Sequence, residues 1–476
     1  MTHRYMGRVT RGAALGLVLA FAACSPDEIL EVEDIDVAFP EVVADSTALP
    51  NILAGAIGEF GFAFNGNAEM NIVTLSGLLS DEFHNTETFP TRIEIDQRRQ
   101  QHTNGTLRDL FYDVQQARAM ADRTEAAYER FLPAAVGRAE ALNLSALTYI
   151  FLAENYCGAV PVSRQLGPAE FELGEMHTTA QLLDSALAKA GRALTIATAA
   201  TGAAATTQAR LSRIIRARAF LNLDQYAEAS AAIGGETGVP STFSYFYKHA
   251  ETTARQNNGT WALTVSVGRF GVPNAEGTNG LPFRSEGLLS NANRDVRIPN
   301  AQRTTNRGLG FDNTTPNFWQ QKYSKRDTLT IVADGVEARL IEAEAQWRAG
   351  DVGGAFLTLN ALRNNGAVKR QRGYLDADLQ PLAMPQLTPA ATPEAQVDQI
   401  FKERAYWLFL TGHRLGDLRR LIRTNALGYN RAPESVFPTG AYHKSGTYGT
   451  DVNTPVPQAE ENNPNFERSA CVVTQA

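Results

Sequence analysis

The chain has 476 residues, of which 43% are hydrophobic, 20% charged and 9% aromatic. This composition excludes a disordered chain, a collagen and a small disulfide-stapled protein. The formal net charge is −7, with acidic and basic residues interspersed. Because nucleic-acid binding requires a basic surface, we expect no nucleic-acid partner.

The N-terminal residues form a predicted export signal. Arg4, Arg8 and Arg11 precede a short apolar run, and Cys24 follows that run directly. A basic segment, an apolar segment and small residues before a cysteine are typical of a bacterial lipoprotein signal. We therefore predict a signal peptide over residues 1–23 and a lipid on Cys24, with an ordinary cleaved signal or a fortuitous apolar start as the alternatives.

The segment after this signal is acidic and contains no Lys or Arg up to Pro40. Such a bias favours hydration over packing, so residues 24–40 are predicted to be a solvated tether. No later apolar run approaches the roughly 20 residues that a membrane-spanning helix needs. The protein is thus expected to contact a membrane through its lipid anchor only.

Helical patterns dominate the chain beyond the tether. Shorter apolar segments occur at about 48–64 and 71–79, and longer ones at 107–132, 139–156 and 179–199. The 139–156 segment is apolar nearly all round, which indicates a central buried helix.

The clearest pattern is a helical hairpin. Val336, Leu340, Ala343 and Trp347 recur at helical spacing, Gly350 interrupts them, and a second apolar stripe follows. The hairpin has the size of a tetratricopeptide unit, and an earlier segment echoes it. Two such units favour an irregular helical repeat array, with a non-repeat bundle as the alternative.

Glycine, asparagine, threonine and proline are frequent from about residue 234 to 330 and again in the C-terminal tail. Helical periodicity is missing there, and only 261–267 looks strand-like. We therefore predict one mainly α unit over 41–476. Its helical framework spans about 41–233 and 331–425, and its irregular portion spans about 234–330 and 426–476.

Two cysteines remain besides Cys24. In an exported protein, Cys157 and Cys471 either form a disulfide that ties the tail to an early helix or stay two independent thiols. The sequence leaves both alternatives open.

No known catalytic motif occurs in the chain, and its seven histidines lack metal-ligand spacing. Asp81 and Glu82 are adjacent, whereas carboxylates that cleave a glycosidic bond lie about 5–10 Å apart across the sugar. We predict no enzyme activity, no cofactor and no metal ligands. Calcium binding stays open, although no loop of EF-hand spacing is present.

One charged cluster needs a separate interpretation. It consists of His413, Arg414, Asp417, Arg419 and Arg420. An anion site is one interpretation. We favour an ion-pair cluster at a helix end, in which Arg414 and Asp417 pair at i, i+3.

Several motifs occur in a distinctive order along the chain. They are Tyr156 to Pro161, Glu403-Arg404, Gly412-His413-Arg414, Asp417 to Arg420, Pro455 to Gln458 and Asn463 to Asn465. With the lipoprotein signal and the helical hairpins, they resemble the SusD/RagB family of outer-membrane nutrient-uptake lipoproteins.

This resemblance implies about four tetratricopeptide-like helical pairs that support an irregular, loop-rich portion. It also implies a lipid-anchored protein of the outer membrane, facing the cell surface, which captures oligosaccharides or peptides and delivers them to a SusC-like TonB-dependent transporter. The helical pairs would face the transporter, and the irregular portion would bind the ligand. The alternatives are a tetratricopeptide-like envelope scaffold that binds no nutrient and, less favoured, an envelope glycoside hydrolase.

Carbohydrate sites combine exposed aromatic rings, on which sugars stack, with amide hydrogen-bonding groups. Within the irregular portion, the candidates of this composition are Trp319, Trp261, Asn317, Gln320, Tyr245 and Tyr247. Core packing is the alternative for the two tryptophans. Trp347 and Trp407 lie on predicted helices and are assigned to packing.

Overall fold

Helices form most of the regular structure in residues 45–166, 170–375 and 378–476, which the computed structural model describes. The mainly α prediction is confirmed. The predicted signal peptide, Cys24 and the tether lie outside the described residues.

The longer helices follow the apolar periodicity of the sequence. They are α4 (Gly105–Phe131), α5 (Val136–Asn155), α6 (Thr179–Ala199), α7 (Ala203–Asn222), α8 (Tyr226–Ile233), α12 (Gly335–Arg348), α13 (Val352–Asn364), α15 (Pro393–Trp407) and α16 (Arg414–Ile422). The remaining helices are α1 (Leu49–Gly61), α2 (Ile72–Leu79), α3 (Pro90–Asp96), α9 (Gly235–Gly238), α10 (Gly259–Trp261), α11 (Phe283–Gly287), α14 (Gly366–Gln371) and α17 (Pro433–Val436).

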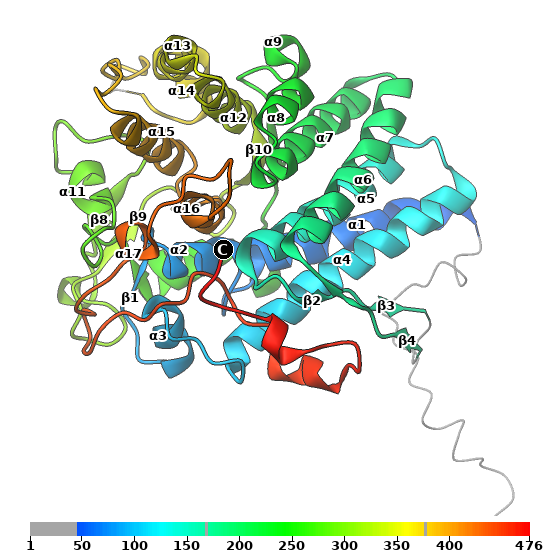
Figure 1. Cartoon of the computed structure of the whole chain (residues 1–476), viewed down its shortest axis with the longest axis horizontal. Coiled ribbons are helices and arrows are strands. Elements are labelled where there is room, and N and C mark those ends of the chain that lie inside the picture. Colours follow the sequence, from blue (N-terminus) through cyan, green and yellow to red (C-terminus); the bar gives the residue numbers. More distant parts are fainter. Residues whose placement is uncertain (1–44, 167–169, 376–377) are drawn as a thin grey trace, which may run out of the picture.

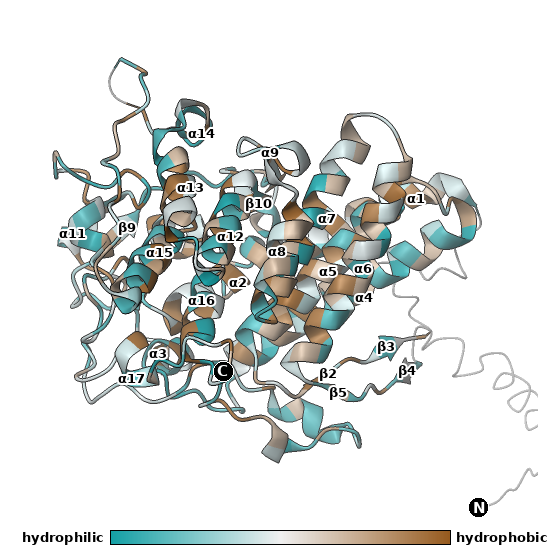
Figure 2. Cartoon of the chain, turned by 45° about the horizontal axis from the view of Figure 1, so that its top comes forward, coloured by the Kyte–Doolittle hydropathy of each residue, from teal (hydrophilic) through white to brown (hydrophobic). Residues whose placement is uncertain are grey.

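Consecutive helices pack against one another to form the framework. Helices α4 to α7 lie side by side, and α8 joins them to α12 and α13 (Figure 1). Helix α5 contacts α4, α6 and α7 and is buried along nearly its whole length, as its apolar composition predicts. Figure 2 shows hydrophobic residues gathered in such central helices and hydrophilic ones in outlying segments such as α11.

Helix α1 and the turns at its ends form a 21-residue stretch, Ser46–Gly66, that is long and apolar enough to cross a membrane by length and composition. The sequence alone predicts no segment of membrane-spanning length after the signal peptide. Six apolar side chains of the stretch are buried, and α1 packs on α4 and α5; they are those of Leu49, Ile52, Ala56, Phe60, Ala63 and Phe64. We therefore interpret it as a core helix of the folded chain.

The hairpin predicted around Gly350 is present as α12 and α13. The Asp334 carboxylate accepts a hydrogen bond of 2.9 Å from the Glu337 amide at the start of α12. Gly350 ends that helix at φ +84°, in the left-handed region that favours glycine. Asp351 then caps α13 through a bond of 2.8 Å from the Gly354 amide. Local sequence therefore determines both helix boundaries.

Short antiparallel strands pair within the irregular portion and at its borders, between the α2–α3 connection and residues 270–271, and within the α5–α6 connection. The pairs are β1 (His84–Asn85) with β7 (Phe270–Gly271), β2 (Val160–Pro161) with β5 (Met176–His177), β3 (Arg164–Gln165) with β4 (Phe171–Glu172), β6 (Ser244–Tyr247) with β10 (Thr330–Asp334), and β8 (Asn300–Gln302) with β9 (Phe318–Gln320). The strand predicted at 261–267 is wrong. Helix α10 and a π-helical turn occupy it, because the Asn258 side chain accepts a bond of 2.9 Å from the Trp261 amide and starts a helix.

The C-terminal tail returns to the end of α5. Tyr156 forms an isolated bridge with Thr454, and the Cys157 amide donates to the Thr454 carbonyl oxygen over 3.0 Å. Cys157 and Cys471 are joined by a disulfide, with their Cα atoms 5.1 Å apart. The tail therefore has both a covalent and a hydrogen-bonded attachment to the helical framework.

Candidate ligand-binding site

A cavity of about 790 Å³ opens among the loops of the irregular portion. Its wall consists of the α2–α3 connection and residues 273–277, 312–316 and 441–448. Many of its lining side chains are charged or polar, among them His84, Glu87, Glu276, Asp312, His443 and Lys444. Its volume lies within the roughly 300–1,000 Å³ range of small-molecule sites.

Two exposed phenylalanines enclose an arginine next to the cavity, since each follows or precedes a lining residue, Thr88 or Asp312, in sequence. Phe89 and Phe311 are 45% and 42% exposed. The guanidinium of Arg269 lies 4.7 and 4.6 Å from their respective ring centroids. An ion pair of 2.5 Å with the cavity-lining Glu87 fixes Arg269 between the rings. This edge of the cavity thus offers apolar ring faces beside polar groups, the combination that a sugar ring can use.

One wall of the cavity is a fixed set of hydrogen bonds. The Lys444 ammonium pairs with Asp312 and donates over 2.8 Å to the Glu87 carbonyl oxygen. The Thr315 amide donates to Asp312 over 2.9 Å. Although burial opposes it, these bonds from Lys444 and Thr315 hold the pKa of Asp312 well below its usual value. The carboxylate therefore stays ionised and in place.

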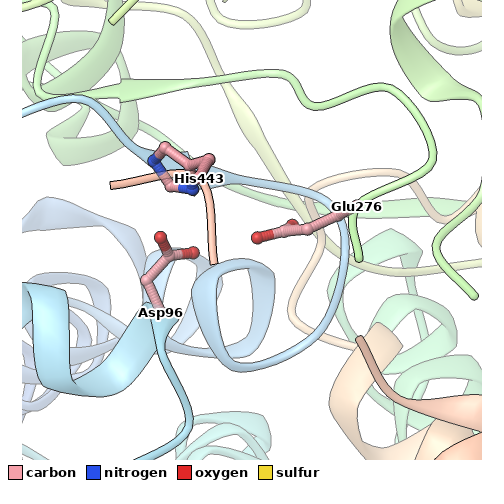
Figure 3. Close-up of side chains that lie close together, drawn as sticks. All are labelled: Asp96, Glu276 and His443. Atoms are coloured by element: carbon pink, nitrogen blue, oxygen red, sulfur yellow. The ribbon is translucent and has the colours of Figure 1, made fainter. Parts of the chain in front are cut away.

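Two buried carboxyl groups and a histidine meet beside the same cavity. They are Asp96, Glu276 and His443, which come from α3, a loop and the tail (Figure 3). Burial, and after it the Asp96 carboxylate, raises the pKa of Glu276 well above its usual value. Burial also raises the pKa of Asp96. The His443 ring lies 5.0 Å from that of His84, centroid to centroid.

The two predicted tryptophans lie outside the lining of this cavity. Trp319 is half-buried in β9, with the Arg303 guanidinium 5.6 Å from its ring centroid. Trp261 is half-buried at the end of α10, with Arg326 at 5.3 Å. Neither tryptophan lines the cavity, and the ligand-binding role of both residues stays a prediction.

The two predicted amides serve the fold instead. Asn317 is fully buried, and its side chain donates to the Thr86 hydroxyl over 2.8 Å. Gln320 is also fully buried and donates over 3.0 Å to the Thr264 hydroxyl. Both side chains hold loops together inside the protein, so neither is available as a ligand contact.

The predicted tyrosines lie on β6, away from the cavity lining. Tyr245 is half-buried and donates a hydrogen bond of 2.8 Å to Glu140. Burial, and after it the Glu140 carboxylate, raises the Tyr245 pKa well above its usual value. The Tyr247 ring packs edge-on against His249 at 4.8 Å. The structure brings neither tyrosine to the predicted tryptophans.

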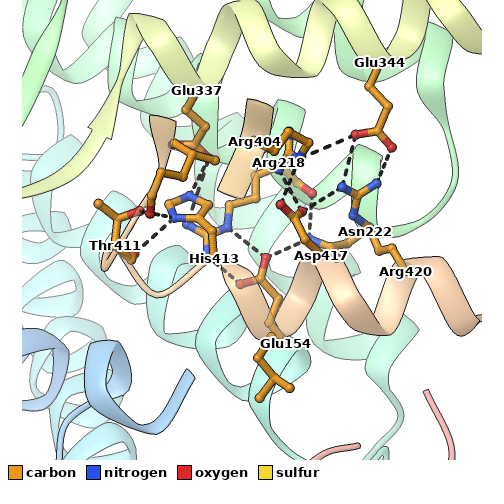
Figure 4. Close-up of polar contacts among 12 residues, drawn as sticks. Glu154, Arg218, Asn222, Glu337, Glu344, Arg404, Thr411, His413, Asp417 and Arg420 are labelled. Atoms are coloured by element: carbon orange, nitrogen blue, oxygen red, sulfur yellow. Dashed lines mark hydrogen bonds and ion pairs between the residues drawn. The ribbon is translucent and has the colours of Figure 1, made fainter. Parts of the chain in front are cut away.

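The charged cluster after Gly412 is part of a larger buried network (Figure 4). Its acidic members are Glu154, Glu337, Glu344 and Asp417, and its basic members are Arg218, Arg404, Arg420 and His413. Every one of these residues is at most 6% exposed. Its arginines are paired with carboxylates and closed to solvent, so the network ties helices together and leaves no open anion site among these residues.

The predicted pair between Arg414 and Asp417 is wrong. Asp417 accepts two bonds of 2.9 Å from Arg404 instead, whereas Arg414 donates to both oxygens of Asp81 over 2.6 and 2.9 Å. An i, i+3 spacing allows a pair but does not select it when the connection after α2 offers a buried carboxylate, Asp81, nearby. Asp81 and its neighbour Glu82 are at most 1% exposed, so they are neither solvated nor placed around a substrate.

Sequence reasoning missed the aromatic edge of the cavity. Phe89 lies in the polar run Asn85 to Phe89, and Phe311 lies between Gly310 and Asp312. A phenylalanine isolated in a polar loop is a signal that a search for tryptophan beside amides does not detect.

No protein-family model matches the chain, and no curated protein matches it. Solved structures, by contrast, do match the chain. A SusD-like protein from Bacteroides fragilis has a TM-score of 0.59 at 14% identity, covering 89% of this chain and 98% of its own. A SusD-like carbohydrate-binding protein from the same species has a TM-score of 0.58 at 16% identity, covering 88% and 98%. The surface glycan-binding protein A of Bacteroides uniformis has a TM-score of 0.59 at 13% identity, covering 89% and 99%. The chain therefore has the fold of SusD-like proteins.

Proposed function

We propose that this protein is a SusD/RagB-type lipoprotein of the outer membrane that binds glycans at the cell surface and passes them to a TonB-dependent transporter. The observation that carries glycan binding is the cavity with its Phe89–Arg269–Phe311 edge. Two structural neighbours, described as a carbohydrate-binding and a glycan-binding protein, support the same ligand class.

The shape of the edge explains how a sugar is held. Phe89 and Phe311 present ring faces that a pyranose can cover, and the Arg269 guanidinium lies between them. Fixed polar groups on the adjoining wall, such as Asp312, then bind sugar hydroxyls. Such a site needs no moving catalytic group, and peptides, which lack flat hydroxylated rings, use it less well.

Export, lipidation at Cys24 and delivery to a barrel rest on the N-terminal sequence and on the family resemblance. A lipid on Cys24 would hold the protein at the membrane while leaving the cavity in solvent. Co-purification in mild detergent tests the partnership, because a large barrel protein is expected to elute with the lipoprotein. Repeated elution of the lipoprotein alone would favour the scaffold alternative.

Glycan binding is tested by titrating the purified protein with a panel of oligosaccharides. We expect the double variant Phe89→Ala, Phe311→Ala to bind its best glycan at least about tenfold more weakly, because one stacked aromatic contributes roughly 0.5–1.5 kcal/mol. Tyr112→Ala is the matched control, since Tyr112 is an equally exposed aromatic residue, 42%, on the framework helix α4.

Two results would contradict this proposal in different ways. Binding that the double variant retains in full would move the site away from the cavity, and Trp319→Ala would then test the position that the sequence favours. A panel in which no glycan binds, while peptides do, would reject the ligand class.

A further inference from the structure

Asp96, Glu276 and His443 form a cluster that glycan binding does not use. One potential ligand atom of each residue lies within 4.8 Å of those of the other two. The residues come from three segments far apart in the sequence, and their side chains point toward one another (Figure 3). The fold therefore brings this cluster together, and no local sequence motif predicts it.

Hydrogen bonds hold one oxygen of each carboxylate. Asp96 Oδ2 accepts from the Asn85 amide over 2.9 Å and from the Tyr442 hydroxyl over 2.6 Å. Glu276 Oε1 accepts from the Tyr448 hydroxyl over 2.9 Å. Donors of this kind orient the carboxylates of metal centres from outside the ligand shell.

The other oxygen of each carboxylate has no N–H or hydroxyl donor among the described residues, and the two carboxyl groups lie within hydrogen-bond reach of each other. These atoms are Asp96 Oδ1 and Glu276 Oε2, and the two residues are only 1% and 6% exposed. An unpaired buried carboxylate is costly, and two that face each other add mutual repulsion. Such a pair needs a shared proton or a cation between its oxygens.

The histidine favours the cation. Nε2 of His443 lies 2.8 Å from the Asn85 carbonyl oxygen. A carbonyl only accepts, so Nε2 carries the hydrogen and Nδ1 keeps the lone pair that a metal ion requires. His443 is exposed, and with Glu276 it lines the cavity, so an ion can enter from solvent.

We propose that Asp96, Glu276 and His443 form a binding site for one divalent transition-metal ion at the wall of the cavity. Two carboxylate oxygens and one imidazole nitrogen suit Zn²⁺ or Mn²⁺, whereas Ca²⁺ and Mg²⁺ prefer oxygen ligands alone. The charge of the ion balances that of the two buried carboxylates. Its remaining coordination positions open toward the cavity.

Calorimetric titration of the purified protein with ZnCl₂ and with MnCl₂ tests this site. We expect one equivalent of at least one of these ions to bind more tightly than Ca²⁺. Glu276→Gln and His443→Ala should each weaken that binding at least tenfold. His102→Ala is the matched control, because His102 is another accessible histidine, 3.9 Å from the carboxylate of Glu461, and should bind the ion as the unsubstituted protein does.

Thermal unfolding of each variant shows whether it is folded, and His443→Ala carries the test if Glu276→Gln is not, since the His443 side chain is exposed. Preference for Ca²⁺ would overturn the assignment to a transition metal. No binding at millimolar ion, or binding by both variants as tight as by the unsubstituted protein, would overturn the site and leave the carboxylates to share a proton. Glycan affinity is measured separately, so the two proposals can fail independently.

Discussion

Asp417 pairs with two buried arginines of the network. Removing its charge therefore tests how much the network contributes to the stability of the fold. The Asp417 carboxylate accepts from Arg404 and from Arg420 over 2.8–2.9 Å. Burial opposes ionisation, but these arginines hold the pKa of Asp417 well below its usual value. Asp417→Asn removes the charge at nearly constant shape and leaves two buried cations undercompensated. We expect the free energy of unfolding to fall by about 3 kcal/mol in urea titrations.

A matched control exists on the surface. Asp398 pairs with Arg431 at 3.2 Å, but its side chain is 68% exposed. Because water already solvates that pair, Asp398→Asn should change stability by less than about 1 kcal/mol. Equal losses of free energy of unfolding in Asp417→Asn and Asp398→Asn would show that burial does not strengthen the ion pairs of the network.

Glu82 predicts a pH dependence of stability. Burial is the main cause that raises its pKa from 4.5 to about 8, against the lowering effect of the Leu410 amide that donates to it over 2.9 Å. Between these two pH values the unfolded chain has lost the proton that the folded protein keeps. The contribution of Glu82 to the free energy of unfolding is therefore fully present below pH 4.5 and is lost as the pH rises to about 8.

Glu82→Gln mimics the protonated form and removes this dependence. Relative to the unsubstituted protein, the variant should gain a few kcal/mol in free energy of unfolding between pH 4.5 and 8, since one pKa unit corresponds to about 1.4 kcal/mol. Urea titrations at several pH values measure the difference. A difference that stays constant with pH would show that Glu82 ionises normally in the folded protein.

Helices α4 to α6 and the α12–α13 hairpin are the elements that the sequence predicts well. Their apolar residues recur at helical spacing, and caps such as Asp351 mark the ends. The 261–267 segment shows the opposite case, since its bulky residues suggest a strand while one preceding side chain, Asn258, starts a helix. A single cap outweighs strand propensity in so short a segment.

The disulfide couples the tail to the end of α5. Cys157 and Cys471 are separated by 314 positions in sequence, so the bond restricts the unfolded chain strongly. Cys157→Ser, Cys471→Ser should lower the free energy of unfolding by about 2–5 kcal/mol. It should also make the tail the first segment that a protease removes.

Thiol counting provides an independent check of this bond. In a Cys24→Ser background, the denatured and unreduced protein should show no free thiol, because the two remaining cysteines are bonded. Two free thiols would contradict the pairing and remove the reason for the expected loss of stability.

The candidate site, unlike the helices, is a property of the whole chain. The cavity draws its lining from the α2–α3 connection and from loops as late as residue 448. None of these segments carries a periodic pattern, and the residues that meet there are too distant in sequence to form a motif. Reasoning from neighbours in sequence therefore selected aromatic residues with nearby amides, and two of those amides, Asn317 and Gln320, proved to be buried structural groups.

We expect ligand binding and transporter contact to use separate surfaces of the molecule. The proposed function assigns ligand binding to the loops around Phe89, and the family resemblance implies transporter contact through the helical pairs. Leu357 on α13 is 73% exposed, an apolar side chain without cover on the framework. Leu357→Asp should reduce co-purification of the barrel several-fold and leave glycan affinity unchanged, because a charge there opposes burial at an interface but lies on a framework helix outside the cavity lining. Phe89→Ala should do the reverse, so each variant is the control for the other. If either substitution impaired both activities, the two surfaces would not be separate, and ligand capture and transporter docking would have to share one face of the protein.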